Sequence, residues 1–269
     1  MKPVSLSTSP RHGRTPMPTF VSDGLTLAYL DEGPRDGDPI VLVHGFGSNA
    51  RVNWVTTGWV DLLVKAGFRV IALDNRGHGA SEGPHDPARY HTRDCLAEDV
   101  RRLMDHLGIA RADVMGYSKG AWITAHLACA HPDRLRSALL GGLAMAMVTG
   151  LGDKEEIVAA LEAETDAEVT GKSGRAYRAF AKQTGSDLLA LAACMRGSRQ
   201  PVPADELRKL RLPVLISVGT RDEVAGSVAD FAALIPGAEV ADIPDRDHMM
   251  AVGDKTHKAG VLAFLARRP

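Results

Sequence analysis

The chain has 269 residues, of which 45% are hydrophobic and 24% charged, a composition typical of a globular protein and not of a disordered or collagenous chain. Its 32 Lys and Arg residues nearly balance its 33 Asp and Glu residues, for a formal net charge of −1. This balance argues against a nucleic-acid partner, which requires a basic surface and a much higher pI.

Cysteine usage and the shortness of the apolar runs favour a cytoplasmic protein with reduced thiols. Cys95, Cys129 and Cys194 are far apart and odd in number, whereas disulfide frameworks and zinc knuckles use cysteines paired at short spacing. Residues 1–19 contain no apolar run of the roughly 7–15 residues typical of a secretory signal. No stretch approaches the roughly 20 apolar residues that span a bilayer. We therefore expect neither a membrane partner nor a metal.

The first elements expected along the chain are an irregular arm and a β-hairpin. Residues 1–18 are rich in Ser, Pro, Thr and basic residues. Residues 19–30 then alternate in hydrophobicity around Asp23-Gly24, a dipeptide favoured in hairpin turns.

After residue 30, continuous apolar runs alternate with segments in which apolar residues recur at helical spacing. Such runs are typical of strands buried on both faces. Strands are expected at residues 39–43, 69–73, 112–115, 137–140, 213–218 and 238–243, and helices at 54–66, 91–107 and 121–130. This alternation predicts an α/β fold, in which a parallel sheet has helices on both faces.

Residues 144–205 interrupt the alternation. They contain no clear strand but three helical candidates, at 154–168, 175–182 and 186–194. We therefore expect a core formed by residues 19–143 and 206–269, with residues 144–205 as a helical insertion on top of the sheet.

The pentapeptide Gly116-Tyr117-Ser118-Lys119-Gly120 follows a predicted strand and begins a predicted helix. A sharp strand-to-helix turn holds its middle residue in a strained conformation that exposes the side chain, and small flanking residues avoid collisions there. Ser118 is therefore a candidate nucleophile. The alternative is a glycine-rich loop with a serine that caps the helix.

A serine hydroxyl becomes an effective nucleophile when a base accepts its proton and an acid orients that base. Asp222 follows the strand at 213–218, and His248 follows the strand at 238–243. The chain order Ser118, Asp222, His248 is the order that this architecture requires. Glu223 is the competing acid, and the other histidines lie in the arm, near helices or in earlier loops.

At this point the chain resembles the α/β-hydrolase superfamily over residues 19–265. The matching motifs are the elbow around Ser118, the late Asp222 and His248, His44-Gly45-Phe46-Gly47 after an early strand, and the segment 74–81 after the next strand. The resemblance implies an eight-stranded, mostly parallel sheet with residues 144–205 as a cap. It also implies that the backbone N–H groups of Phe46 and Lys119 form an oxyanion hole. It implies a bracing role for residues 74–81.

Two residues depart from the pattern of this superfamily. Lys119 stands where relatives often have Met, Leu or Gln. Its ammonium either binds an anionic substrate or strengthens the oxyanion hole, or else its chain extends to water and only its N–H group matters. Asp247 stands where relatives often have Gly, which makes it an alternative to Asp222 as the residue that orients His248.

The function implied by the resemblance is that of a carboxylesterase-like serine hydrolase without a cofactor. Its substrate would be a small to medium ester, thioester or lactone, cleaved through an acyl-enzyme on Ser118. Serine at the elbow argues against dehalogenases and epoxide hydrolases, which have aspartate there. A C–C bond hydrolase or a cofactor-free peroxidase uses the same triad. We expect a monomer or homodimer, and activity that rises through about pH 6–8 as the base loses its proton. The sequence does not identify substrate-binding residues.

Two other function classes remain open on the sequence. Residues 45–50 fit the G-x-G-x-x-[GA] pattern of dinucleotide-binding dehydrogenases, and Asp74 ends the next strand, where a ribose-binding acid would lie. That hypothesis leaves the elbow, Asp222 and His248 unexplained. A non-catalytic ligand receptor on the same scaffold is the other alternative.

Overall fold

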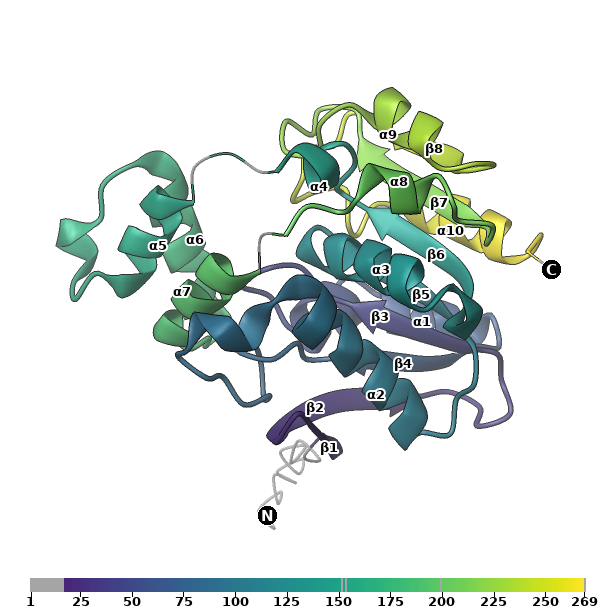
Figure 1. Ribbon diagram of the computed structural model, residues 1–269, viewed down its shortest axis with the longest axis horizontal. Helices are drawn as coiled ribbons and strands as arrows, with labels where there is room; N and C mark the ends of the chain where they lie inside the picture. Colours follow the sequence, from purple (N-terminus) through teal and green to yellow (C-terminus); the bar gives the residue numbers. More distant parts are fainter. Residues whose placement is uncertain (1–16, 151, 153, 199, 269) are drawn as a thin grey trace, which may run out of the picture.

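The expected α/β sheet is present in the computed structural model, which describes residues 17–150, 152, 154–198 and 200–268 (Figure 1). Its strands are β1 (Thr19–Ser22), β2 (Leu25–Glu32), β3 (Pro39–Val43), β4 (Arg69–Leu73), β5 (Ala112–Tyr117), β6 (Leu135–Gly141), β7 (Val214–Gly219) and β8 (Glu239–Ile243). They form one 8-stranded sheet in the order β1-β2-β4-β3-β5-β6-β7-β8. β3 to β8 pair in parallel, and β1 and β2 add an antiparallel edge. The predicted fold class is confirmed.

The antiparallel edge is the hairpin that Asp23-Gly24 predicts. Both residues have positive φ, 51° for Asp23 and 75° for Gly24, which is the backbone twist that a two-residue hairpin turn requires. The irregular arm expected before the hairpin, at 1–18, lies almost entirely outside the described residues, which begin at 17.

Helices cover both faces of the sheet, which explains why the central strands are apolar without alternation. On one face α1 (Trp59–Lys65) and α10 (Lys255–Leu265) pack against side chains such as Ile40 and Leu42. On the other face α2 (Glu98–His106), α3 (Lys119–Ala130) and α9 (Val228–Leu234) pack against side chains such as Val41 and Val43. Successive residues of β3 thus belong to two separate cores.

The chain between β6 and β7 is helical. Its helices are α4 (Ala146–Thr149), α5 (Glu155–Glu162), α6 (Lys172–Gln183), α7 (Leu188–Gly197) and α8 (Ala204–Leu207). Figure 1 shows α5, α6 and α7 as a group to one side of the sheet. They share a small apolar core that includes Val158, Leu161, Ala181 and Leu191. None of the described helices has the length and apolar character needed to cross a membrane.

The helix expected at 154–168 ends six residues early, at Glu162. Arg178, which belongs to α6, donates hydrogen bonds from Nη1 to the carbonyl oxygens of Ala160 and Ala163 at 2.7 and 2.9 Å. These carbonyls lie in the last turn of α5, where intrahelical partners are missing. A charged donor from another helix therefore stabilises the end of α5, and a single 3₁₀ turn, Asp166–Glu168, follows.

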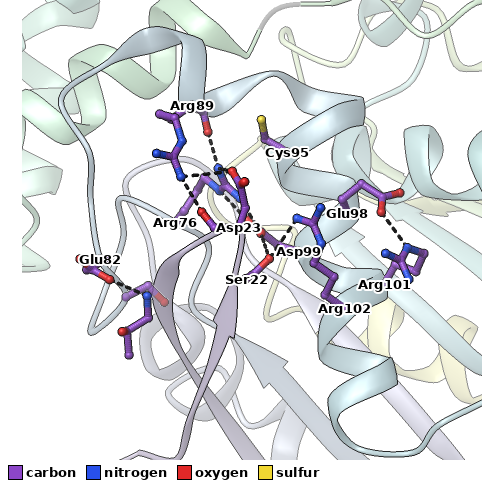
Figure 2. A network of polar contacts seen from close by, with 12 residues as sticks. Ser22, Asp23, Arg76, Glu82, Arg89, Cys95, Glu98, Asp99, Arg101 and Arg102 are labelled. Carbon is purple, nitrogen blue, oxygen red and sulfur yellow. Dashed lines mark hydrogen bonds and ion pairs between the residues drawn. The ribbon is translucent and has the colours of Figure 1, made fainter.

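A buried ion pair joins the hairpin, the loop after β4 and α2 (Figure 2). Arg76 donates from Nε and Nη2 to the two oxygens of Asp99, each at 2.7 Å, and from Nη1 to the Arg89 carbonyl at 2.6 Å. Ser22 donates to Asp99 at 2.5 Å. Both charged side chains are at most 1% exposed. Burial raises the pKa of Asp99, and the Arg76 guanidinium opposes that rise.

Removal of the acid from this pair should destabilise the protein strongly. We expect Asp99→Ala to lower the free energy of unfolding by about 3–5 kcal/mol, because the Arg76 charge would remain buried without its partner. Urea denaturation followed by circular dichroism measures the loss. The matched control is Asp205→Ala, which breaks the exposed Asp205–Arg208 pair and should cost about 1 kcal/mol or less. Equal losses in the two variants would contradict the expectation.

Candidate active site

Ser118 lies on a sharp turn between β5 and α3. Its φ is 54° and its ψ is −120°, a conformation that residues other than glycine rarely adopt. The neighbouring backbone is tightly packed: a Cβ atom on Gly116 would overlap the Gly120 carbonyl, and one on Gly120 would overlap the Val43 carbonyl. The two glycines of the pentapeptide are therefore required for the turn, and the turn projects the Ser118 side chain beyond the end of the strand.

The loops after β7 and β8 bring Asp222 and His248 to this serine. His248 Nε2 lies 2.9 Å from Ser118 Oγ, and His248 Nδ1 lies 2.7 Å from Asp222 Oδ2. With the ring proton on Nδ1, the imidazole donates to Asp222, and its Nε2 accepts the Ser118 hydroxyl. The Asp222 side chain is fully buried and that of His248 is 14% exposed. The three residues thus form one continuous chain of hydrogen bonds.

The structure places Asp222, and neither of its competitors, against the imidazole. Asp222 Oδ1 accepts the N–H groups of Val224 and Ala225 at 2.8 and 3.2 Å, which leaves Oδ2 for His248. Asp247 Oδ1 instead accepts the N–H groups of Met249 and Met250, at 3.0 and 2.8 Å. Glu223 is exposed.

Phe46 and Lys119, the residues expected to supply the oxyanion hole, both line a small cavity beside Ser118. The Lys119 ammonium donates to the hydroxyl of Ser198 and, at 3.4 Å, to its carbonyl oxygen. Ser198 directly follows α7, so this side chain links the start of α3 to the end of α7. The Lys119 side chain therefore lies along the wall of the cavity and is not extended into solvent.

The segment 74–81 packs against the loop that carries Phe46. Asp74 is buried, and its two oxygens accept the N–H groups of Ala50 and Ala80, at 2.7 and 2.8 Å. Because Asp74 is buried and each of its oxygens already binds an N–H group of the protein, it is not accessible to a ribose, which argues against the dehydrogenase alternative. His78 is buried with its ring 5.7 Å from that of Phe46, and burial lowers the pKa of His78 well below its usual value. These contacts fit a bracing role.

His44 is also part of this support. Its Nε2 accepts the N–H group of Asn75 at 3.0 Å, and its Nδ1 lies 2.8 Å from the carbonyl oxygen of Gly45. Burial lowers its pKa. Both ring nitrogens are therefore engaged in holding the loop that carries Phe46, and neither faces Ser118.

A larger cavity opens in front of Ser118 and His248, and its wall is mostly apolar. Its lining includes Phe46, Val52, Tyr177, Phe180, Met249 and Val252. Tyr177 and Phe180 belong to α6, so the helices between β6 and β7 contribute directly to the site. Among the described residues, no group of three or more His, Cys, Asp and Glu side chains could hold a metal ion.

Sequence reasoning missed most residues of this lining. Val52 lies in a short π-helical turn, Arg51–Val55, and Met249 and Val252 lie in the loop between β8 and α10, so no motif marks any of them. In α7, Leu191 is fully buried in the core of α5 to α7, Leu189 is 49% exposed, and Met195 lines the small cavity.

A buried histidine beneath the His248 loop should make stability depend on pH. His257 packs against Trp59, with ring centroids 5.0 Å apart, and burial lowers its pKa to about 4 from 6.5. Between these values the unfolded chain binds a proton that the folded protein excludes, so stability is full above about pH 6.5 and falls toward pH 4. The loss at pH 4 approaches about 3 kcal/mol for this residue.

We expect His257→Gln to reduce the slope of unfolding free energy against pH in this window by about 1.4 kcal/mol per pH unit, the equivalent of one proton. Urea denaturation at several pH values between 4 and 7 measures this slope. Thr124→Val, at a buried side chain that does not titrate, is the control and should leave the slope unchanged. An unchanged slope in His257→Gln would show that this residue does not take up the proton.

Comparisons with known proteins agree with the fold. Residues 38–161 match the model of the alpha/beta hydrolase fold family. The chain is 27% identical to a non-heme chloroperoxidase of Streptomyces lividans over 91% of this chain and 97% of that protein. It is 31% identical to a dihydrolipoyllysine-residue acetyltransferase component of the acetoin cleaving system of Pseudomonas putida, over 91% of this chain and 68% of that protein. A hydrolase from Pseudomonas aeruginosa PA01 superposes with a TM-score of 0.76 at 26% identity, over 95% of this chain and 99% of that one.

Proposed function

The chain belongs to the α/β-hydrolase superfamily, and from this premise we propose that it is a serine hydrolase for a small to medium carboxylic ester, thioester or lactone. The observation that carries the proposal is the hydrogen-bonded chain from Ser118 through His248 to Asp222, at 2.9 and 2.7 Å. A base within hydrogen-bond reach of the hydroxyl and an acid that orients the base are the two requirements of an activated serine.

In the proposed reaction Ser118 Oγ attacks the substrate carbonyl carbon while His248 Nε2 takes the hydroxyl proton. The backbone N–H groups of Phe46 and Lys119 donate to the oxyanion that forms, and the Asp222 carboxylate stabilises the imidazolium. The C–O or C–S bond then breaks, and the leaving group takes the proton from His248. Water attacks the acyl-enzyme with His248 again as the base, which releases the acid and restores Ser118.

The apolar wall of the larger cavity supports an acyl group of small to medium size. Tyr177 and Phe180 bring two aromatic side chains of α6 to this wall. We propose that residues 144–205, which include α5, α6 and α7, act as the cap over the site. In this arrangement the hydrophobic part of the substrate binds between the cap and the π-helical turn that carries Val52.

A cofactor-free peroxidase activity is the second candidate, favoured by the similarity to a chloroperoxidase over nearly its full length. Hydrogen peroxide would replace water in attacking the acyl-enzyme, which would release a peracid and free Ser118. The first half of the reaction and its residues stay the same. Accumulation of peracid, measured with and without peroxide on one ester, separates the two functions.

Labelling with a fluorophosphonate tests the proposal directly. We expect one phosphonyl adduct by intact mass, formed as Ser118 Oγ displaces fluoride, and peptide mapping should place it on Ser118. A panel of aryl esters of increasing acyl length, a thioester, a lactone and a C–C hydrolase substrate then defines the reaction. A folded protein that neither forms the adduct nor turns over any of these substrates would contradict the proposal and favour the ligand-receptor alternative.

A further inference from the structure

Tyr117 connects the nucleophile's own strand to the loop that carries His248. It is the last residue of β5, directly before Ser118, and its hydroxyl donates to the carbonyl oxygen of His248 at 2.6 Å. The two rings lie 5.7 Å apart, and Tyr117 is 4% exposed. The side chain directly before Ser118 therefore holds the backbone of His248, the residue to which Ser118 is hydrogen-bonded.

The end of β6 leaves room for this tyrosine. A Cβ atom on Gly141 would lie 2.8 Å from Tyr117 Cδ2, and one on Gly142 would lie 2.7 Å from Tyr117 Cζ. Contacts this short do not occur between real side chains, so two consecutive glycines are needed where the ring passes. The Tyr117 ring therefore lies directly against the backbone of these glycines, and its hydroxyl extends from there to the His248 carbonyl oxygen.

The His248 loop is exposed directly after the histidine, and its apolar packing begins only at Ala251, which is fully buried. Met249 and Met250 directly follow the histidine and are 63% and 60% exposed. Farther along the loop, Trp59 Nε1 donates to the carbonyl oxygen of Val252 at 2.7 Å. The Tyr117 hydroxyl binds the carbonyl of His248 itself, so it restrains the backbone position of the base directly. Burial raises the pKa of Tyr117, and the hydroxyl therefore keeps its proton and donates throughout the neutral range.

We propose that Tyr117 is a positioning residue for the reaction proposed above, and that its hydroxyl holds the His248 loop so that Nε2 stays within hydrogen-bond distance of Ser118 Oγ. The inference rests on that proposed function for its kinetic consequence. Displacement of a catalytic group by about 1 Å can cost roughly 100-fold in rate. Loss of one anchor loosens the loop without removing it, so a smaller effect, about 10-fold, is expected.

The test is Tyr117→Phe, which keeps the ring between the glycines and removes the hydroxyl. The matched control is Tyr90→Phe: Tyr90 is also buried, and its hydroxyl donates at 2.7 Å to the carbonyl oxygen of Pro84, within the segment between β4 and α2 and not to His248. We expect Tyr117→Phe to lower kcat and the rate of fluorophosphonate labelling about 10-fold, with KM within twofold. Tyr90→Phe should leave all three unchanged, although both variants lose a buried hydrogen bond.

Proton NMR of the His248 Nδ1–H signal adds a readout that needs no turnover. We expect this downfield signal to broaden or shift in Tyr117→Phe and to stay in place in Tyr90→Phe. If wild type hydrolyses esters and Tyr117→Phe matches it in rate and in NMR signal, the inference is wrong and the proposed function stands. If wild type is inert, the proposed function is wrong. In that case an unchanged His248 Nδ1–H signal in Tyr117→Phe would still overturn the inference on its own.

Discussion

Replacement of Ser118 with alanine is expected to lower kcat for ester hydrolysis by about 10⁴- to 10⁶-fold. The hydroxyl is the atom that the proposed mechanism uses to form the acyl-enzyme, and a neighbouring hydroxyl cannot replace it without a base at 2.9 Å. KM should change little, because alanine preserves the shape of the cavity. Fluorophosphonate labelling should disappear in the same variant.

The fold should tolerate this substitution, since alanine and serine have the same restriction at a φ of 54°. Stopped assays with long incubation, combined with an unfolding curve, measure the residual rate on a protein known to be folded. Ser227→Ala is a suitable control: Ser227 caps α9 by accepting the N–H group of Asp230, and its loss should cost about 1 kcal/mol of stability without affecting kcat. Residual activity within 10-fold of wild type in Ser118→Ala would identify a different nucleophile.

The turn at Ser118 could be predicted from the sequence because its causes are local. Gly116 and Gly120 are required by contacts within a few residues of the turn or with the adjacent β3, and the strand before it and the helix after it have clear patterns. The sheet was predictable for a similar reason. A strand buried on both faces is a continuous apolar run, so each strand could be recognised from its own residues alone.

Contacts between distant parts of the chain could not be predicted in the same way. The Tyr117 hydroxyl meets the backbone of a residue 131 positions later, and nothing in the pentapeptide reveals that contact. The end of α5 is a second example. The helical pattern continues beyond Glu162, but Arg178 from α6 binds the terminal carbonyls and fixes the end of the helix.

The choice between Asp222 and Asp247 shows the limit most clearly, because the sequence places each acid where it could reach His248. In the structure, backbone N–H groups set the direction of each carboxylate. Those of Val224 and Ala225 bind one oxygen of Asp222 and turn the other toward the imidazole. Those of Met249 and Met250 bind Asp247 within its own turn. A loop's local hydrogen bonding therefore sets the direction of each carboxylate, and sequence patterns do not record that direction.

This geometry makes Asp222→Asn the second substitution with a very large expected effect, a loss in kcat of about 10³- to 10⁴-fold. The side-chain oxygen of the asparagine would keep the bonds to Val224 and Ala225, and its NH₂ group would then face His248 Nδ1. That nitrogen would have to accept instead of donate, so the ring proton would move to Nε2. In that tautomer Nε2 cannot accept the proton of Ser118, although every atom is near its original place.

Asp247→Asn is the matched control, because it makes the same chemical change one residue from the base. Its oxygen can still accept the N–H groups of Met249 and Met250, so we expect kcat within about threefold of wild type. Steady-state kinetics on one aryl ester, with both variants checked for folding, compares them. The opposite pattern, a large loss in Asp247→Asn and a small one in Asp222→Asn, would mean that the loop rearranges during turnover and that Asp247 orients the base. Large losses in both would mean that the two carboxylates act together on His248, since a single orienting acid predicts that only one of the two substitutions changes the tautomer.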